Sequence, residues 1–105
     1  MDDTNYSIPD LLQLLKSERG DRLECRVTLP PILVIKGHDF EIEGPPITEA
    51  GADELFRSVA ESRDVRAFRK HGVAEFIYTF KNSQFVVHAK KEFGYVHLDI
   101  SLVAA

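Results

Sequence analysis

Two histidines and an aspartate near the end of this 105-residue sequence are the residues best suited to chemistry. His88, His97 and Asp99 fall at alternating positions of two predicted strands, and imidazole and carboxylate groups are ligands of Zn²⁺ and related metals. A register that sets His88 opposite His97 would bring three such ligands onto one sheet face. A histidine pair on a solvent-facing sheet needs no metal, and this spacing lacks a closed set of ligands. We therefore expect no metal site.

Cys25 is the single cysteine, so the chain has no internal disulfide framework. It alternates with Leu23 and Val27, which predicts that the thiol points into the core and behaves as a small hydrophobic group. A nucleophilic cysteine needs an exposed, activated thiolate instead. No local motif supports a Ser-His-Asp triad, and the glycines form neither a Walker A nor a G-x-G-x-x-G sequence. We expect no catalytic residue, no cofactor and no enzymatic activity.

Residues 57–71 are basic within a chain whose net charge is −4. The acidic balance of the whole chain disfavours general nucleic-acid binding, which needs an excess of lysine and arginine. A solvated helix face is the ordinary interpretation of the basic segment, and a contact with an acidic partner surface is the more specific one.

The elements that must position these residues follow from apolar spacing and turn signals. The order α-β-β-β-α-α-β-β-β predicts one α+β domain over residues 1–105, with helices on one face of an antiparallel sheet of about six strands. Ser7 and Thr48 are expected helix caps, and Gly20 and Gly72 are expected helix stops. We expect strands from Leu23 and over residues 32–36, 39–43, 74–80, 84–91 and 95–103.

The strand register follows from the expected turns. Gly37-His38 suits a type II′ turn, and Asn82-Ser83 and Glu92-Phe93 are taken as the turns of the last three strands. These turns pair Leu33 with Ile42, Phe76 with Ala89, and Ala89 with Val96. On the opposite face they set Glu75, Lys90 and Tyr95 in one row, with Ile77, His88 and His97 in the next.

Apolar side chains beside charge on that opposite face resemble a protein interface more than a solvated sheet. The basic segment supplies a further set of exposed side chains. The predicted interaction residues are Ile77, Val86, Phe93, Tyr95, Lys91, Arg63, Arg66, Arg69 and Lys70.

No apolar stretch approaches the roughly 18 residues that a membrane helix requires. The acidic start Met1-Asp2-Asp3 also lacks the pattern of a signal peptide. We expect a cytoplasmic protein that does not insert into membranes.

Several segments match a known family pattern. Residues 8–15 form a leucine-rich opening, Pro30-Pro31 precedes a strand that ends at Gly37, and residues 44–48 read Gly-Pro-Pro-Ile-Thr. Residues 72–78 read Gly-Val-Ala-Glu-Phe-Ile-Tyr. From Ile8 onward the chain resembles the N-terminal domain of the type IV pilus retraction ATPase PilT and its type II secretion relatives.

This resemblance implies a PAS-like domain that, in the motor family, packs against the RecA-like ATPase domain of a neighbouring subunit. The RecA-like half and its Walker motifs are absent from the 105 residues. Cys25 stands where the family has a histidine, and Gln84 and Val86 replace two arginines of its Arg-Phe-Arg hairpin, while Lys91 retains a positive charge.

The resemblance implies a non-catalytic interaction module in twitching motility or type II secretion. Its expected partner is a protein such as a hexameric pilus or secretion ATPase, and a homo-oligomer is the other assembly open to it. Two alternatives remain: a fragment of a full-length PilT-type ATPase, and a PAS-like sensor that holds a small ligand between sheet and helices. Few polar groups converge on the predicted core face, namely Cys25 and Tyr78.

Overall fold

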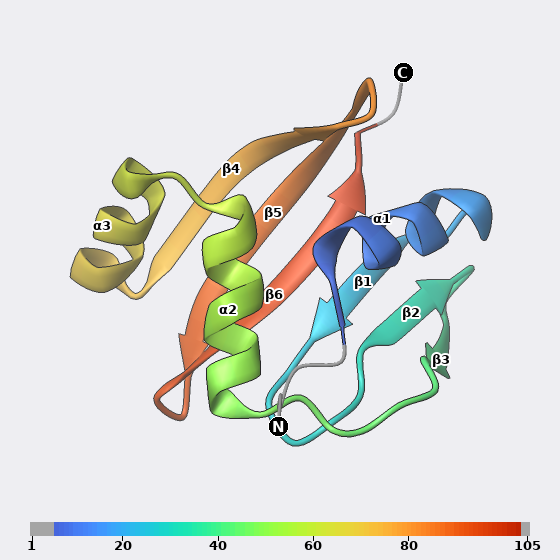
Figure 1. Ribbon diagram of the computed structural model, residues 1–105, viewed down its shortest axis with the longest axis horizontal. Helices are drawn as coiled ribbons and strands as arrows, with labels where there is room; N and C mark the ends of the chain where they lie inside the picture. The colour runs from blue at the N-terminus through green and yellow to red at the C-terminus, as the bar shows by residue number, and fades with distance from the viewer. Residues whose placement is uncertain (1–5, 104–105) are drawn as a thin grey trace.

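The structure, a computed structural model, describes residues 6–103 and contains a six-stranded antiparallel sheet with helices packed on it (Figure 1). The sheet order is β3-β2-β1-β6-β5-β4, and the predicted element order and α+β class are confirmed. The elements are α1 (Ile8–Ser17), β1 (Arg22–Cys25), β2 (Ile32–Ile35), β3 (His38–Glu41), α2 (Glu49–Val59), α3 (Ser62–His71), β4 (Val73–Phe80), β5 (Ser83–Glu92) and β6 (Tyr95–Leu102).

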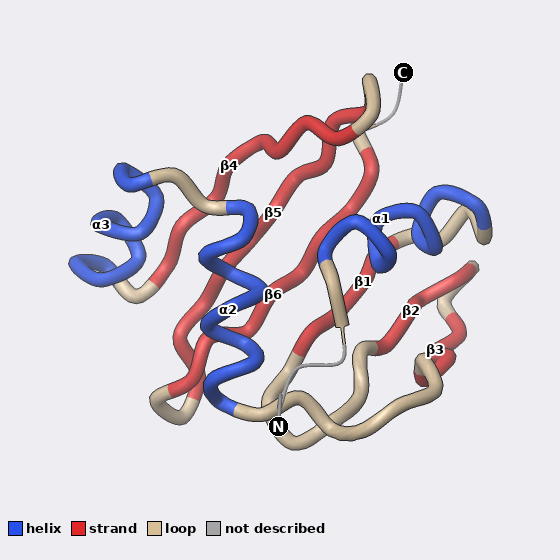
Figure 2. Tube along the Cα trace, viewed as in Figure 1, coloured by secondary structure: helices blue, strands red, loops and turns tan. Residues whose placement is uncertain are grey.

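Helices α1 and α2 cross one face of the sheet, and α3 lies beside the edge strand β4 (Figure 2). The apolar stripe of α1 is fully buried, because Ile8, Leu11, Leu12 and Leu15 recur at helical spacing and all face the sheet. Burial of each such side chain contributes about 1.5–3 kcal/mol relative to exposure. The core therefore lies between these two helices and one sheet face.

The helix ends carry the predicted capping residues. The Ser7 hydroxyl accepts a hydrogen bond from the amide of Asp10 at 3.3 Å, and the Thr48 hydroxyl accepts one from Gly51 at 2.9 Å. Both bonds satisfy amides that a helix N-terminus leaves free. Gly72 ends α3 in the left-handed region with φ 76°. The expected caps and this stop are confirmed.

The expected stop at Gly20 is wrong in its detail. Helix α1 ends at Ser17, and Arg19 takes the left-handed conformation with φ 54°. The amide of Gly20 then donates to the carbonyl of Leu15 at 3.0 Å, which closes a Schellman motif. A Cβ atom at Gly20 would stand 2.7 Å from Leu33 Cδ1, so any larger residue here would displace the end of that leucine side chain.

The three expected hairpin turns are each wrong by one residue. The turns are Lys36-Gly37, Lys81-Asn82 and Phe93-Gly94, and all six residues have positive φ. Positive φ at both central residues defines the type I′ turn, whose twist matches that of the flanking strands. Leu33 consequently pairs with Phe40, Phe76 with Val87, and Ala89 with Leu98. Because each shift moves the pairing by two residues, every side chain keeps its predicted face.

Phe93 occupies its turn against local preference, since it is 94% exposed and has φ 53°. A left-handed conformation costs a non-glycine residue roughly 1–2 kcal/mol, and asparagine tolerates it better than phenylalanine. We expect Phe93→Asn to raise the free energy of unfolding by about 0.5–1 kcal/mol, measured by urea denaturation. Phe40→Asn, at an exposed strand position without positive φ, is the matched control and should not stabilise the chain. A loss of stability in Phe93→Asn would contradict this account.

Candidate functional site

The sheet face away from α1 and α2 carries the candidate metal ligands His88, His97 and Asp99. Strand pairing places Glu75, His88 and Asp99 side by side across β4, β5 and β6. His97 lies opposite Lys90 instead of His88. The predicted facing histidine pair is therefore wrong, because it depended on the misplaced turns.

His97 is the centre of a charged network on this face. The residue is 8% exposed, and its Nδ1 lies 2.9 Å from a carboxylate oxygen of Glu92. Its Nε2 lies 3.2 Å from Arg26 Nε and 3.2 Å from a carboxylate oxygen of Asp99. Both ring nitrogens thus have protein partners, which suits a structural role better than metal binding or proton transfer. Within residues 6–103 no group of three or more ligand side chains is arranged to hold a metal ion.

The hydrogen bond to the His97 ring holds the pKa of the Glu92 carboxyl below its ordinary value. A carboxyl whose pKa is lowered in the folded state stabilises the fold above its ordinary pKa, and this contribution is lost as the pH falls through the lowered value. We expect His97→Phe to raise the pKa of Glu92, measured by NMR titration of its carboxyl carbon. Lys90→Gln, which removes a looser contact of 3.8 Å, is the control and should change this pKa less. An unchanged Glu92 titration in His97→Phe would refute the proposed coupling.

Cys25 lies in the core, as its alternation with Leu23 predicts, and both residues are 0% exposed. Burial raises the pKa of the Cys25 thiol to about 12, and the nearby carboxylates of Asp99 and Glu24 add to the effect. The thiol is therefore neutral at physiological pH and has no access to a substrate.

This raised pKa predicts a loss of stability in alkali. The unfolded chain releases the thiol proton near pH 8.5 to 9, whereas the folded chain retains it to about pH 12, so stability falls as the pH rises between these values. We expect the wild-type chain to lose about 2 kcal/mol more than Cys25→Ala between pH 8 and pH 10.5, measured by urea denaturation. Equal losses of unfolding free energy in the two proteins would contradict this prediction, because they would show that the thiol ionises as readily in the folded chain as in the unfolded one.

The predicted interaction residues of the sheet fall into two separate groups. Ile77, which is 54% exposed, pairs with Val86, and Val86 pairs with Ser101 of β6. Tyr95 lies six residues before Ser101 on that strand, a distance of about 20 Å. The expected adjacency of Tyr95 and Ile77 is therefore wrong, for the same reason as the histidine pair.

The β5–β6 hairpin gathers the second group, which we call the hairpin surface: Lys91, Phe93, Tyr95 and the hollow beside them. Phe93 projects from the turn, and Tyr95 is 37% exposed. The hollow is lined by Glu49, Asp53, Phe68, Lys91, Gly94, Tyr95 and Val96. Sequence reasoning missed Glu49, Asp53 and Phe68 because they come from α2 and α3, and no local signal links them to the hairpin.

Helix α3 carries the remaining predicted residues. Arg66, Arg69 and Lys70 are exposed and form no ion pair with residues 6–103. Arg63 makes only long contacts, at 3.9 Å to Glu61 and 3.8 Å to Asp64, and its side chain is 76% exposed. The helix therefore presents unneutralised positive charge at the β4 side of the sheet.

None of the helices in the described part of the chain has the length and apolar character needed to cross a membrane.

Comparison with solved structures defines the fold class. The pilus retraction motor PilT with bound ADP matches 96% of this chain with a TM-score of 0.87 and 16% identity. The ATPase DotB of Legionella pneumophila matches all of it with a TM-score of 0.78 and 12% identity. The ATPase DotB of Yersinia pseudotuberculosis matches 98% with a TM-score of 0.73 and 7% identity.

These matches confirm at the level of fold the expected resemblance to pilus and secretion ATPases. The chain spans only 30%, 31% and 33% of the length of those proteins. No family model and no curated protein sequence matches the chain.

Proposed function

We propose that this chain is a non-catalytic interaction module that docks, in the cytoplasm, on a motor ATPase of the pilus or secretion type. The observation that carries the proposal is the PilT fold match, with a TM-score of 0.87 over 96% of the chain. The sequence supplies no Walker A motif with which these residues would hydrolyse ATP.

The hairpin surface is the docking site that we favour. Phe93 is 94% exposed and adopts a backbone conformation that suits another residue better. Such a side chain does not stabilise the fold, because it packs against nothing and disfavours the turn conformation. Burial against a partner protein would account for its presence. Lys91 and Tyr95 lie two residues before and after it in the chain, and exposed aromatic side chains near a charge are enriched at protein interfaces.

The exposed pair of Ile77 and Val86 is a separate contact candidate, since it lies about 20 Å along the sheet from Tyr95. The two groups can therefore be tested independently.

The chain matches only part of the length of the similar ATPases, and this supports a second candidate function. Because the chain spans about 30% of PilT, it also suits the corresponding part of a larger ATPase, in which it would contribute subunit contacts and no hydrolysis. The reading frame after Ala105 distinguishes the assignments, since a P-loop downstream supports the larger protein.

We expect affinity purification of the tagged chain from its own cells to recover a pilus or secretion ATPase in near-stoichiometric amount, identified by mass spectrometry. Phe93→Ala with Tyr95→Ala should reduce this recovery at least about tenfold, because aromatic anchors contribute most of the binding free energy in many interfaces. Ile77→Thr is the matched control, because it lies about 20 Å along the sheet from Tyr95, and it should leave the recovery unchanged.

The reverse pattern, loss with Ile77→Thr alone, would transfer the docking site to the pair of Ile77 and Val86. Recovery of no such ATPase by the wild-type chain would refute the proposed function itself.

A further inference from the structure

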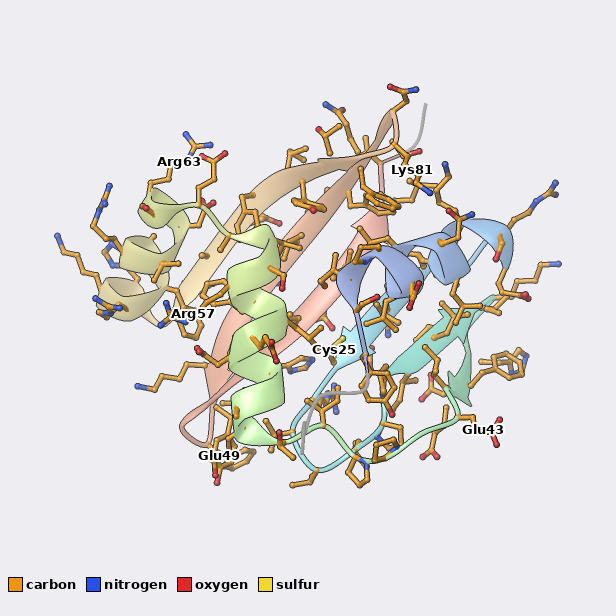
Figure 3. All side chains as sticks on the ribbon, viewed as in Figure 1. Cys25, Glu43, Glu49, Arg57, Arg63 and Lys81 are labelled. Atoms are coloured by element: carbon orange, nitrogen blue, oxygen red, sulfur yellow. The ribbon has the colours of Figure 1, made fainter. Side chains whose placement is uncertain are left out.

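The two ends of the sheet carry opposite charge. We define the acidic end as Asp39, Glu41 and Glu43, on and just after edge strand β3, and the basic end as α3 beside the other edge strand, β4. Figure 3 shows Glu43 beyond β3 on one side of the molecule, and Arg57 and Arg63 on the opposite side. The strand order therefore separates two charged segments by the full width of the sheet.

Most of the charges at the two ends have no ion-pair partner among residues 6–103. Asp39, Glu41 and Glu43 are exposed and, like Arg66, Arg69 and Lys70, form no ion pair with residues 6–103. Arg22 is two strands in from Asp39, and its Nε already donates to Glu24 at 2.7 Å. The width of six strands is about 24 Å, well beyond the screening length of about 8 Å at physiological ionic strength.

Apolar groups accompany the charges at both ends. Phe40 is 52% exposed between Asp39 and Glu41, and it pairs with Leu33, which faces the helices. At the basic end a hollow lies between the end of α2, the start of α3 and β4. Its lining is Ser58, Val59, Ala60, Glu61, Arg63, Asp64, Ile77, Tyr78 and Thr79. The hollow offers apolar groups to the Phe40 ring, and its Arg63 is already matched by Glu61 and Asp64. The attraction between the two ends therefore comes from Arg66, Arg69 and Lys70 of α3.

We propose that copies of this chain associate head to tail, with the acidic end of one copy on the basic end of the next and Phe40 in the hollow. A symmetric contact of α3 with α3, or of β3 with β3, would oppose like charges and is disfavoured. The contact is therefore heterologous. Any chain of copies keeps one free acidic end and one free basic end, to which further copies can bind. This self-association needs no ATPase and is independent of the proposed docking function.

The test reverses two charges at each end, at exposed positions only. The basic-end variant is Arg66→Glu with Arg69→Glu, and the acidic-end variant is Asp39→Lys with Glu41→Lys. By sedimentation equilibrium in 50 mM salt, we expect the wild-type chain to associate beyond a dimer as its concentration rises toward about 1 mM. Each variant alone should associate at least about tenfold more weakly.

An equimolar mixture of the two variants is the decisive sample. The intact basic end of the acidic-end variant should bind the intact acidic end of the basic-end variant. The two reversed ends also carry opposite charges, so the mixture should regain the association beyond a dimer that each variant alone has lost. Phe40→Ala should weaken wild-type association at least about tenfold as well. Circular dichroism of each variant checks that the fold is retained.

Three results would overturn the proposal: a monomeric wild-type chain up to about 1 mM, an acidic-end variant that self-associates like the wild type, or a mixture that remains monomeric. Unchanged association of Phe40→Ala would remove Phe40 from the contact. Because purified chain is the only component, these results do not depend on whether an ATPase is recovered from cells.

Discussion

The pairing of β1 with β6 is the contact on which the rest of the structure depends. It joins an N-terminal half of one helix and three strands to a C-terminal meander, with Leu23 opposite Ile100 and Cys25 opposite Leu98. All four residues are 0% exposed, so the two halves share one core. This central pair of strands therefore determines where the acidic end, the basic end and the hairpin surface lie.

The type I′ turns decide which side chains meet on that sheet. A shift of the pairing by two residues leaves the buried face unchanged, because side chains alternate with a period of two. It nevertheless exchanges every cross-strand neighbour. The β5–β6 turn sets His97 opposite Lys90 instead of His88 and brings Glu92 to its ring, while the β1–β6 pairing supplies Arg26. The expected histidine pair is replaced by a hydrogen-bonded network.

Two exposed features of this fold do not contribute to its own stability: the side chain of Phe93 and the charges at the two sheet edges. Phe93 sits in a turn conformation that asparagine or glycine would adopt at lower cost, which makes it a conformational liability unless it is covered. The charges of α3 and of β3 are kept apart by the width of the sheet, so they do not neutralise each other. Both features leave the side chains concerned exposed to solvent.

The sequence by itself determined the local structure: the caps at Ser7 and Thr48, the stop at Gly72, the apolar stripe of α1 and the burial of Cys25. Each depends on residues within a few positions, so spacing alone carries the information. The type of each hairpin turn could not be predicted from the sequence. A type I′ turn needs positive φ at both central residues, and residues such as Lys36 and Phe93 rarely adopt it. Only the tertiary structure decided the strand order, the partners of His97, the lining of the hairpin hollow and the placement of opposite charges at opposite sheet edges. These features join residues far apart in the chain, and their geometry arises only when β1 and β6 pair and the helices cover one face.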